Sequence, residues 1–272
     1  AKLMKEIPDN FIDLTVTSPP YDNLRDYKGY SFDFETIARE LYRVTKKGGI
    51  VVWVVGDATI NGSETGTSFR QALFFMNVGF YLHDTMIYQK KKAPLTHNRY
   101  EQEFEYMFVL SKGLINVFHP IMIEKSYKDN RKSKGFGRRN DLDSIDIGYA
   151  SQSTDKIKGN VWFYKVGGGH VTKDKIAHIH PAIFPEDLAK DHILSWSNEG
   201  DLVFDPFAGS GTTLKMAKLM NRNYLGFEIA EEYIPIINKR LGQETVLAFC
   251  PTERIISVKR ESADSPNSPH DS

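Results

Sequence analysis

Short apolar runs alternate with amphipathic segments along most of this chain, and this alternation constrains the fold more than any other feature. Residues 12–17 and 50–55 are rich in β-branched side chains, which favour strands. Residues 34–44 and 69–78 carry apolar side chains at helical spacing. Strands that are apolar almost throughout are typical of sheets covered on both faces. The pattern therefore predicts an α/β fold, with a mostly parallel twisted sheet and helices on both faces.

The same periodicities predict the remaining elements. The second strand is expected to begin at Ile50, after the sequence Lys46-Lys47-Gly48-Gly49. Further strands are expected at 81–88, 106–110, 202–204 and 224–228, and further helices at 187–197, directly after Thr212 and at 231–241.

Between residues 123 and 160 the periodicity disappears, and the sequence becomes polar, basic and glycine-bearing. We predict that this segment is a surface insertion in one domain, whose two halves are residues 1–122 and 161–245. Residues 246–272 would form a C-terminal extension. The end of this extension is rich in Ser, Pro and Asp and lacks large apolar residues, which predicts disorder there.

Charge and cysteine content exclude several classes of protein. Among 272 residues, 35 Lys and Arg balance 35 Asp and Glu, so attraction to a polyanion must come from local clustering. The single cysteine, Cys250, excludes an internal disulfide framework and a cysteine-based zinc site. We find no apolar run long enough to span a bilayer and no charged-then-apolar leader. We therefore expect a soluble, cytoplasmic protein and, from the abrupt start at Ala1, a missing N-terminal piece.

Residues 204–213, Phe-Asp-Pro-Phe-Ala-Gly-Ser-Gly-Thr-Thr, join a predicted strand to a predicted helix. Gly209 and Gly211 let a ligand approach the main chain, and the amides that open the next helix favour an anionic group. Asp205 at the strand tip can receive an ammonium group, and Phe207 offers an apolar or cation-π face. The segment has the composition of a ligand-binding loop.

Glu228 ends the next predicted strand, where a carboxylate can accept both hydroxyls of a ribose. Together with the loop it suits a ligand that has an amino-acid end and a nucleoside end. A lone Gly-x-Gly would favour an ordinary αβ turn or a nicotinamide dinucleotide site. The Asp-Pro-Phe before the glycines and Glu228 after them favour S-adenosylmethionine.

A second motif, Ser18-Pro19-Pro20-Tyr21, follows the first predicted strand. The two prolines stiffen the backbone and remove two amide donors, which leaves carbonyl oxygens as acceptors beside the Ser18 hydroxyl. An amino group is the natural partner of such acceptors, and Tyr21 can stack on a ring that has left a duplex. A bare Pro-Pro would favour the alternative, a turn that closes a strand.

These motifs, in this order, resemble those of the permuted group of bacterial and phage DNA amino-methyltransferases, between about Ile7 and Leu241. The resemblance implies a Rossmann-like, S-adenosylmethionine-dependent methyltransferase fold with circularly permuted motif order, the catalytic half first and the cofactor-binding half second. Ser18, Pro19, Pro20 and Tyr21 match the family's catalytic tetrapeptide. The cofactor-binding positions fall on Asp205, Pro206, Phe207, Gly209, Ser210, Gly211, Thr212 and Glu228, and on His180, Pro181, Ala182 and Phe184 in a segment that completes the methionine pocket.

The resemblance also implies site-specific methylation of double-stranded DNA through base flipping, with S-adenosylmethionine as the cofactor. In this family a serine at the first tetrapeptide position is usually associated with N4 of cytosine, and an aspartate with N6 of adenine. We therefore place N4-cytosine ahead of N6-adenine, and a non-catalytic DNA-binding protein with this fold is a third interpretation. A cognate restriction endonuclease and a homodimer remain open as partners.

The chain departs from the family's pattern at one point. Members usually carry a further strand and a Gly-Asp pair upstream of the catalytic strand, and these contribute to the pocket for the cofactor's adenine. This sequence starts too late to contain them. We expect either a truncation or another segment at that edge.

The predicted insertion contains a cluster of seven basic residues, with Tyr127 and Phe136 between them. They are Lys125, Lys128, Arg131, Lys132, Lys134, Arg138 and Arg139. Most charge runs are merely solvated, but this composition also suits phosphate contacts and base readout, and we expect the insertion to contact DNA. His178 and His180, near Asp187 and Asp191, lack a matched ligand set, so no metal site is predicted.

Overall fold

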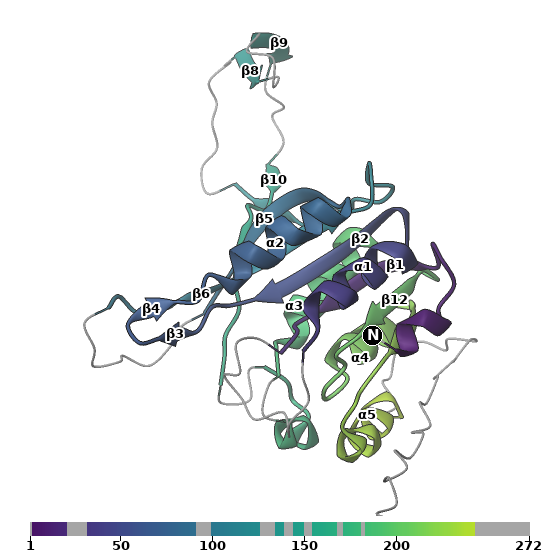
Figure 1. Ribbon diagram of the computed structural model, residues 1–272. Coiled ribbons are helices and arrows are strands. Elements are labelled where there is room, and N and C mark those ends of the chain that lie inside the picture. Colours follow the sequence, from purple (N-terminus) through teal and green to yellow (C-terminus); the bar gives the residue numbers. More distant parts are fainter. Residues whose placement is uncertain are drawn as a thin grey trace, which may run out of the picture.

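A seven-stranded sheet lies at the centre of the molecule, with helices on both faces (Figure 1). The computed structural model describes residues 2–20, 32–90, 99–125, 134–138, 144–149, 154–167, 171–180 and 183–242. The strand order is β11-β5-β6-β2-β1-β12-β13. All neighbouring strands run parallel except the two pairs that include β6. The sheet is therefore mostly parallel, as the apolar strands predict.

The bounds of the elements are as follows. The sheet contains β1 (Ile12–Thr17), β2 (Thr45–Val55), β5 (Tyr81–Gln89), β6 (Phe104–Ser111), β11 (Val161–Phe163), β12 (Leu202–Asp205) and β13 (Asn223–Gly226). The helices are α1 (Phe34–Val44), α2 (Thr67–Val78), α3 (Glu186–Trp196), α4 (Thr212–Leu219) and α5 (Ile234–Leu241), with 3-10 helices η1 (Leu3–Glu6), η2 (Lys175–Ile179) and η3 (Glu231–Tyr233). Three separate pairs are β3 (Thr59–Ile60) with β4 (Ser63–Glu64), β7 (Met122–Glu124) with β10 (Asp155–Ile157), and β8 (Lys134–Arg138) with β9 (Ser144–Tyr149).

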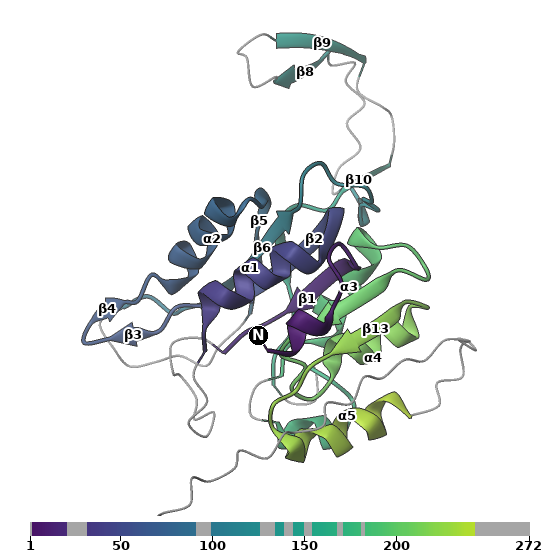
Figure 2. The ribbon, with the colours of Figure 1, turned by 45° about the vertical axis from the view of Figure 1, so that its right-hand side comes forward.

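Two cores lie on opposite faces of the sheet. Helices α1 and α2 cover one face and α3 and α4 the other, as the two views show (Figures 1 and 2). Successive side chains of a strand point to opposite faces, and residues 50–55 of β2 are all buried. Val51, Trp53 and Val55 pack on the α1 and α2 side, whereas Ile50 and Val52 pack on the α3 and α4 side. This two-sided burial explains why the strand sequence is continuously apolar.

The order of the strands reverses between β1 and β12. From β1 the chain passes through α1 to β2, which lies on one side of β1. On the other side β12 continues through α4 to β13, so the two connections run in opposite directions. The loops that leave β1 and β12 at their carboxyl ends therefore diverge. In open α/β sheets, ligands bind at such a topological switch point.

The structure differs from the sequence-based elements at several places. The helix expected at 231–241 is η3 followed by α5, and β8, β9 and β10 lie within the segment 123–160. Strand β2 begins at Thr45, because Thr45 pairs with Ile12 before a register shift, and Gly48 in this stretch adopts a left-handed φ of +80°. Strand β11 was not predicted, and its three residues pair with the end of β5. Strand β13 ends at Gly226, which leaves Glu228 in the loop beyond it. Within the described ranges, no helix is long and apolar enough to cross a membrane.

Candidate active site

The two sequence motifs meet at the switch point. Thr17 ends β1 and directly precedes Ser18, while Asp205 ends β12 and begins the glycine loop. The Thr17 hydroxyl donates a 2.6 Å hydrogen bond to Asp205 Oδ1, and both residues are buried. Ser18, the next residue after Thr17, is half-buried. The predicted catalytic tetrapeptide and the predicted cofactor loop therefore start from adjacent strand ends, although 188 positions separate the two bonded residues.

Asp205 is a buried carboxyl group with one free acceptor. Its Oδ1 accepts hydrogen bonds from Thr17 and from the Phe207 amide at 3.0 Å, whereas Oδ2 is buried without a partner. Burial raises the pKa of Asp205 to about 6, against the lowering effect of the Thr17 and Phe207 hydrogen bonds. A buried acceptor of this kind favours a cationic donor, since the ion pair would satisfy both the charge and the free oxygen.

The glycine loop turns tightly between β12 and α4. Gly209 and Gly211 have φ values of +53° and +79°, a region that side chains with a Cβ rarely adopt. The Gly211 amide donates to Ala208 O at 2.6 Å, which closes the turn. A Cβ at Gly209 would lie 3.0 Å from Cε1 and Nε2 of His180, so the His180 ring packs directly against this backbone.

His180 belongs to the segment that the resemblance assigns to the methionine pocket. It follows η2, and its ring centroid lies 4.4 Å from that of Tyr233, with the rings tilted at 66°. Further along, Phe184 is partly buried against the core on the α3 and α4 side. The structure thus brings His180 to the glycine loop.

Glu228 also contacts the glycine loop. Its Oε2 accepts the Gly209 amide at 2.7 Å and its Oε1 accepts the Ala230 amide at 2.8 Å. Burial raises the pKa of Glu228, and these amide hydrogen bonds act in the opposite direction. Each carboxylate oxygen has two acceptor sites, so both oxygens keep capacity for a hydroxyl donor.

Phe207 lies in an aromatic cluster at the same edge. Its ring centroid is 5.6 Å from that of Phe32 and 6.2 Å from that of Trp53, both in edge-on arrangements. Such pairs stabilise a fixed ring orientation. Phe207 therefore supports the loop by packing, and its half-buried ring retains some exposed surface.

Comparison with known proteins identifies the family. The sequence profile of a family described as DNA methylase matches residues 12–239, which includes both motifs. The chain belongs to the N6/N4 DNA methylase family. It is 56% identical over 249 residues to the orphan methyltransferase M.BamHII of Bacillus amyloliquefaciens, with 90% of this chain and 94% of that protein covered.

One relative and one protein of similar structure differ in the base that their names specify. This DNA methylase is 30% identical over 271 residues to the DNA adenine methyltransferase YhdJ of Escherichia coli (strain K12), with 94% of this chain and 84% of that protein covered. The structure of the cytosine-N4-specific PvuII DNA methyltransferase has a TM-score of 0.63 at 21% identity, covering 90% of this chain and 84% of that one. The structural likeness confirms the predicted α/β methyltransferase fold.

The family is S-adenosylmethionine-dependent, and the residues at this edge fit that cofactor. Asp205 offers a buried, unpartnered acceptor that suits an ammonium group. Glu228 retains acceptor capacity that suits a hydroxyl donor. The predicted cofactor chemistry and the side chains of the switch point therefore agree.

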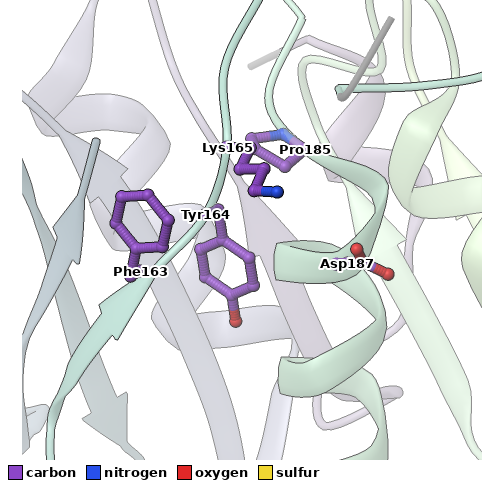
Figure 3. Close-up of a pocket in the computed structure, with 5 residues that line it drawn as sticks. All are labelled: Phe163, Tyr164, Lys165, Pro185 and Asp187. Atoms are coloured by element: carbon purple, nitrogen blue, oxygen red, sulfur yellow. The ribbon is translucent and has the colours of Figure 1, made fainter. Parts of the chain in front are cut away.

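A pocket of about 260 Å³ lies at the carboxyl end of β11 (Figure 3). It is lined by Phe163, Tyr164, Lys165, Pro185 and Asp187. Because β11 runs parallel to β5, which runs in the direction of β1, the pocket lies at the same edge of the sheet as Ser18. The Tyr164 hydroxyl donates to Asp191 Oδ2 at 2.8 Å, and burial is the main cause of its raised pKa.

Sequence reasoning missed some residues of this edge and named others that the structure does not describe. Thr17 and Tyr164 were missed. The position of Thr17 beside Ser18 could have indicated Thr17, whereas Tyr164 had no comparable signal in the sequence. Tyr21, Pro181, Ala182, Lys128, Arg131, Lys132 and Arg139 lie outside the described residues. In the basic cluster, Lys134 and Arg138 begin and end β8, and the half-buried Lys125 pairs its amide with Thr154 O at 2.9 Å.

Proposed function

We propose that this DNA methylase transfers a methyl group from S-adenosylmethionine to the exocyclic N4 amine of cytosine in double-stranded DNA. The observation that carries the proposal is the 2.6 Å hydrogen bond from Thr17 to Asp205, because it sets the strand end that bears Ser18 against the start of the cofactor loop. The serine at the first position of the tetrapeptide supports cytosine as the target base.

The cofactor would be held from three sides. Asp205 Oδ2 would accept the ammonium group, the amides at the start of α4 would face the carboxylate, and Glu228 would accept the ribose hydroxyls. When bound, the cofactor supplies a methyl group on a positively charged sulfur. His180 packs on Gly209 and would limit the space beside the methionine end.

The amine would be held by the strand end of β1. Ser18 Oγ and Pro19 O would accept hydrogen bonds from the N4 amine, which would localise the lone pair on its nitrogen. Tyr21 would stack on the base after it leaves the duplex. Ser18 and Pro19 would hold the amine while Asp205 and Glu228 would hold the cofactor, so positioning would be the main catalytic effect of this chain.

The test is the identity of the methylated base. Wild-type protein is incubated with labelled S-adenosylmethionine and mixed-sequence duplex DNA, and the nucleosides are analysed by mass spectrometry. We expect N4-methylcytosine. N6-methyladenine would refute the target base while retaining the reaction, and binding of the cofactor without any methylated base would support a non-catalytic DNA-binding protein.

Cofactor affinity should fall at acidic pH. The pKa of Asp205 is raised to about 6, so protonation below that pH removes the charge that would bind the ammonium group. We expect the Kd for S-adenosylmethionine to rise by up to about tenfold for each pH unit below about 6. Calorimetry between about pH 5 and pH 8, in buffers of different ionisation enthalpy, measures both the Kd and the coupled proton release. A Kd that stays constant over this range would contradict the role of Asp205.

The basic cluster should control DNA affinity. Changing Arg131, Lys132, Arg138 and Arg139 to Gln should weaken duplex binding about tenfold at moderate salt and reduce the salt slope by about four, because each cation would neutralise about one phosphate. Cofactor affinity should not change. Fluorescence anisotropy over a salt series is the measurement. A control variant changes exposed lysines outside the cluster, Lys2, Lys5, Lys47 and Lys239, to Gln. Equal losses in the two variants would contradict a specific DNA contact.

A further inference from the structure

A buried cluster of four charged side chains contacts the glycine loop through one of its members. The four are Asp174, Glu186, Lys215 and Arg240. Arg240 of α5 is only 1% exposed, and its Nη2 donates to Glu186 Oε1 at 2.6 Å. Its Nε lies 3.2 Å from Asp174 Oδ2. Lys215 of α4 completes the cluster, with Nζ 2.6 Å from Asp174 Oδ2 and 2.9 Å from Glu186 Oε1. Two cations therefore balance two carboxylates in a largely buried site.

Arg240 also contacts the loop itself. Its Nη1 donates to Ser210 O at 2.6 Å, to Ser210 Oγ at 3.0 Å and to Thr212 Oγ1 at 3.2 Å. Ser210 lies between Gly209 and Gly211, the two residues with left-handed backbone. Glycines leave this turn many conformations in the absence of outside contacts. The guanidinium is the contact that fixes the carbonyl between them.

The same cluster reaches the other side of the loop. Asp174 directly precedes η2, whose last residue is followed by His180, and the His180 ring packs against Gly209. Helix α5 packs against η2 and α4 (Figure 2). Asp174 thus links the Arg240 guanidinium, which contacts Ser210, to the 3-10 helix η2, which leads to His180 at Gly209. A planar guanidinium can hold several acceptors in fixed directions at once, which an ammonium cannot.

We propose that Arg240 is a positioning residue for cofactor binding, and that the charge cluster holds the glycine loop and residues 174–180 in the geometry that binds S-adenosylmethionine. The inference rests on the proposed cofactor site. Arg240 does not touch the reacting atoms, because its guanidinium lies on the Ser210 backbone and on buried carboxylates. Its removal should therefore change the affinity for the cofactor more than the rate of transfer.

The test is Arg240→Lys in the full chain. This substitution keeps the charge and removes the planar fork. We expect the Kd for S-adenosylmethionine, measured by calorimetry, to rise about tenfold, equivalent to about 1.4 kcal/mol. The kcat at saturating cofactor and DNA should stay within about threefold of wild type. In the cofactor-free protein, hydrogen exchange of the amides of residues 209–212 should become faster.

Arg222→Lys is the matched control. Arg222 is also buried, at 6% exposure, but it lies before β13 at the opposite edge and donates to Ser197 O and Met220 O, both at 2.6 Å. We expect the control to lose thermal stability and to keep the wild-type Kd and loop exchange. If Arg240→Lys behaves like the control, so that stability falls while the Kd stays within about twofold, the proposal is wrong.

A second variant covers the case in which Arg240→Lys does not fold. Glu186→Gln keeps an oxygen acceptor for Arg240 and removes one charge of the cluster, and we expect about a threefold rise in the Kd. An unchanged Kd for a folded Glu186→Gln protein would overturn the proposal. Wild-type protein that fails to bind S-adenosylmethionine would instead refute the proposed cofactor site, so the two failures are distinguishable.

Discussion

Replacing Asp205 with Asn should weaken S-adenosylmethionine binding about 100-fold, because a lost buried charge pair costs roughly 2–5 kcal/mol. The amide would present a neutral group to the ammonium in place of the carboxylate oxygen that has no partner in the structure. Calorimetry at about pH 7.5 measures the Kd directly. A Kd within about threefold of wild type would contradict the assignment of Asp205 to the ammonium group.

The same variant should not lose stability at neutral pH. Folding raises the pKa of Asp205 to about 6, so the ionised carboxylate disfavours the folded state above that pH, and its effect is lost as the group protonates at lower pH. The neutral amide removes this penalty, and its oxygen can still accept from Thr17. We expect the Tm at neutral pH to stay the same or rise.

Asp13→Asn is the matched control for Asp205→Asn. Asp13 also connects β1 to β12, but at the opposite end of the strands, where its Oδ2 accepts the Leu202 amide at 2.9 Å and its Oδ1 pairs with Lys46 at 2.6 Å. This control should lower the Tm slightly and leave the Kd unchanged. The two variants together separate a defect in the strand pair from a defect in the cofactor site.

Ser18→Ala should lower the kcat about 100-fold with little change in the Kd for S-adenosylmethionine, because the amine loses one of its two acceptors in the transition state. Single-turnover methylation of duplex DNA measures the transfer step. Wild-type turnover by the variant would contradict the role of the Ser18 hydroxyl.

Tyr21→Ala should likewise impair turnover far more than cofactor binding, since it removes the surface on which the base would stack.

Thr17→Val should give the opposite pattern, although Thr17 is the neighbour of Ser18. The substitution preserves the shape of the side chain and removes the 2.6 Å hydrogen bond to Asp205 Oδ1. The pKa of Asp205 should rise further, because this hydrogen bond lowers it. We expect a weaker Kd at neutral pH and a near-normal kcat at saturating cofactor. If Thr17→Val and Ser18→Ala both affected only the kcat, the assignment of Thr17 to cofactor binding and Ser18 to methyl transfer would be wrong.

Local sequence predicted the elements well where one face or both faces of an element are buried. The predicted bounds of β1 and α1, residues 12–17 and 34–44, agree with the structure. Their apolar residues recur at the strand or helix period because these side chains form the two cores. The glycine loop was equally visible, since left-handed backbone at Gly209 and Gly211 requires residues without a Cβ.

Prediction failed where pairing with a distant strand decides the structure. Residues 45–49 look like a polar, glycine-containing loop, but Thr45 pairs with Ile12 and extends β2. Strand β11 has only three residues, and its place in the sheet comes from its pairing with Ile87, Tyr88 and Gln89 of β5. Such short elements carry almost no periodic signal.

The sequence by itself determined the fold class and the two motifs, because apolar periodicity, glycine conformation and side-chain functional groups are local properties. The tertiary structure alone decided that the strand order reverses between β1 and β12, which places Thr17 against Asp205. It also decided that the buried Arg240 donates to Ser210 O and pairs with Asp174 and Glu186, which belong to two other segments. These contacts join residues far apart in the chain, and only the packing of strands and helices around the cores determines which of them meet.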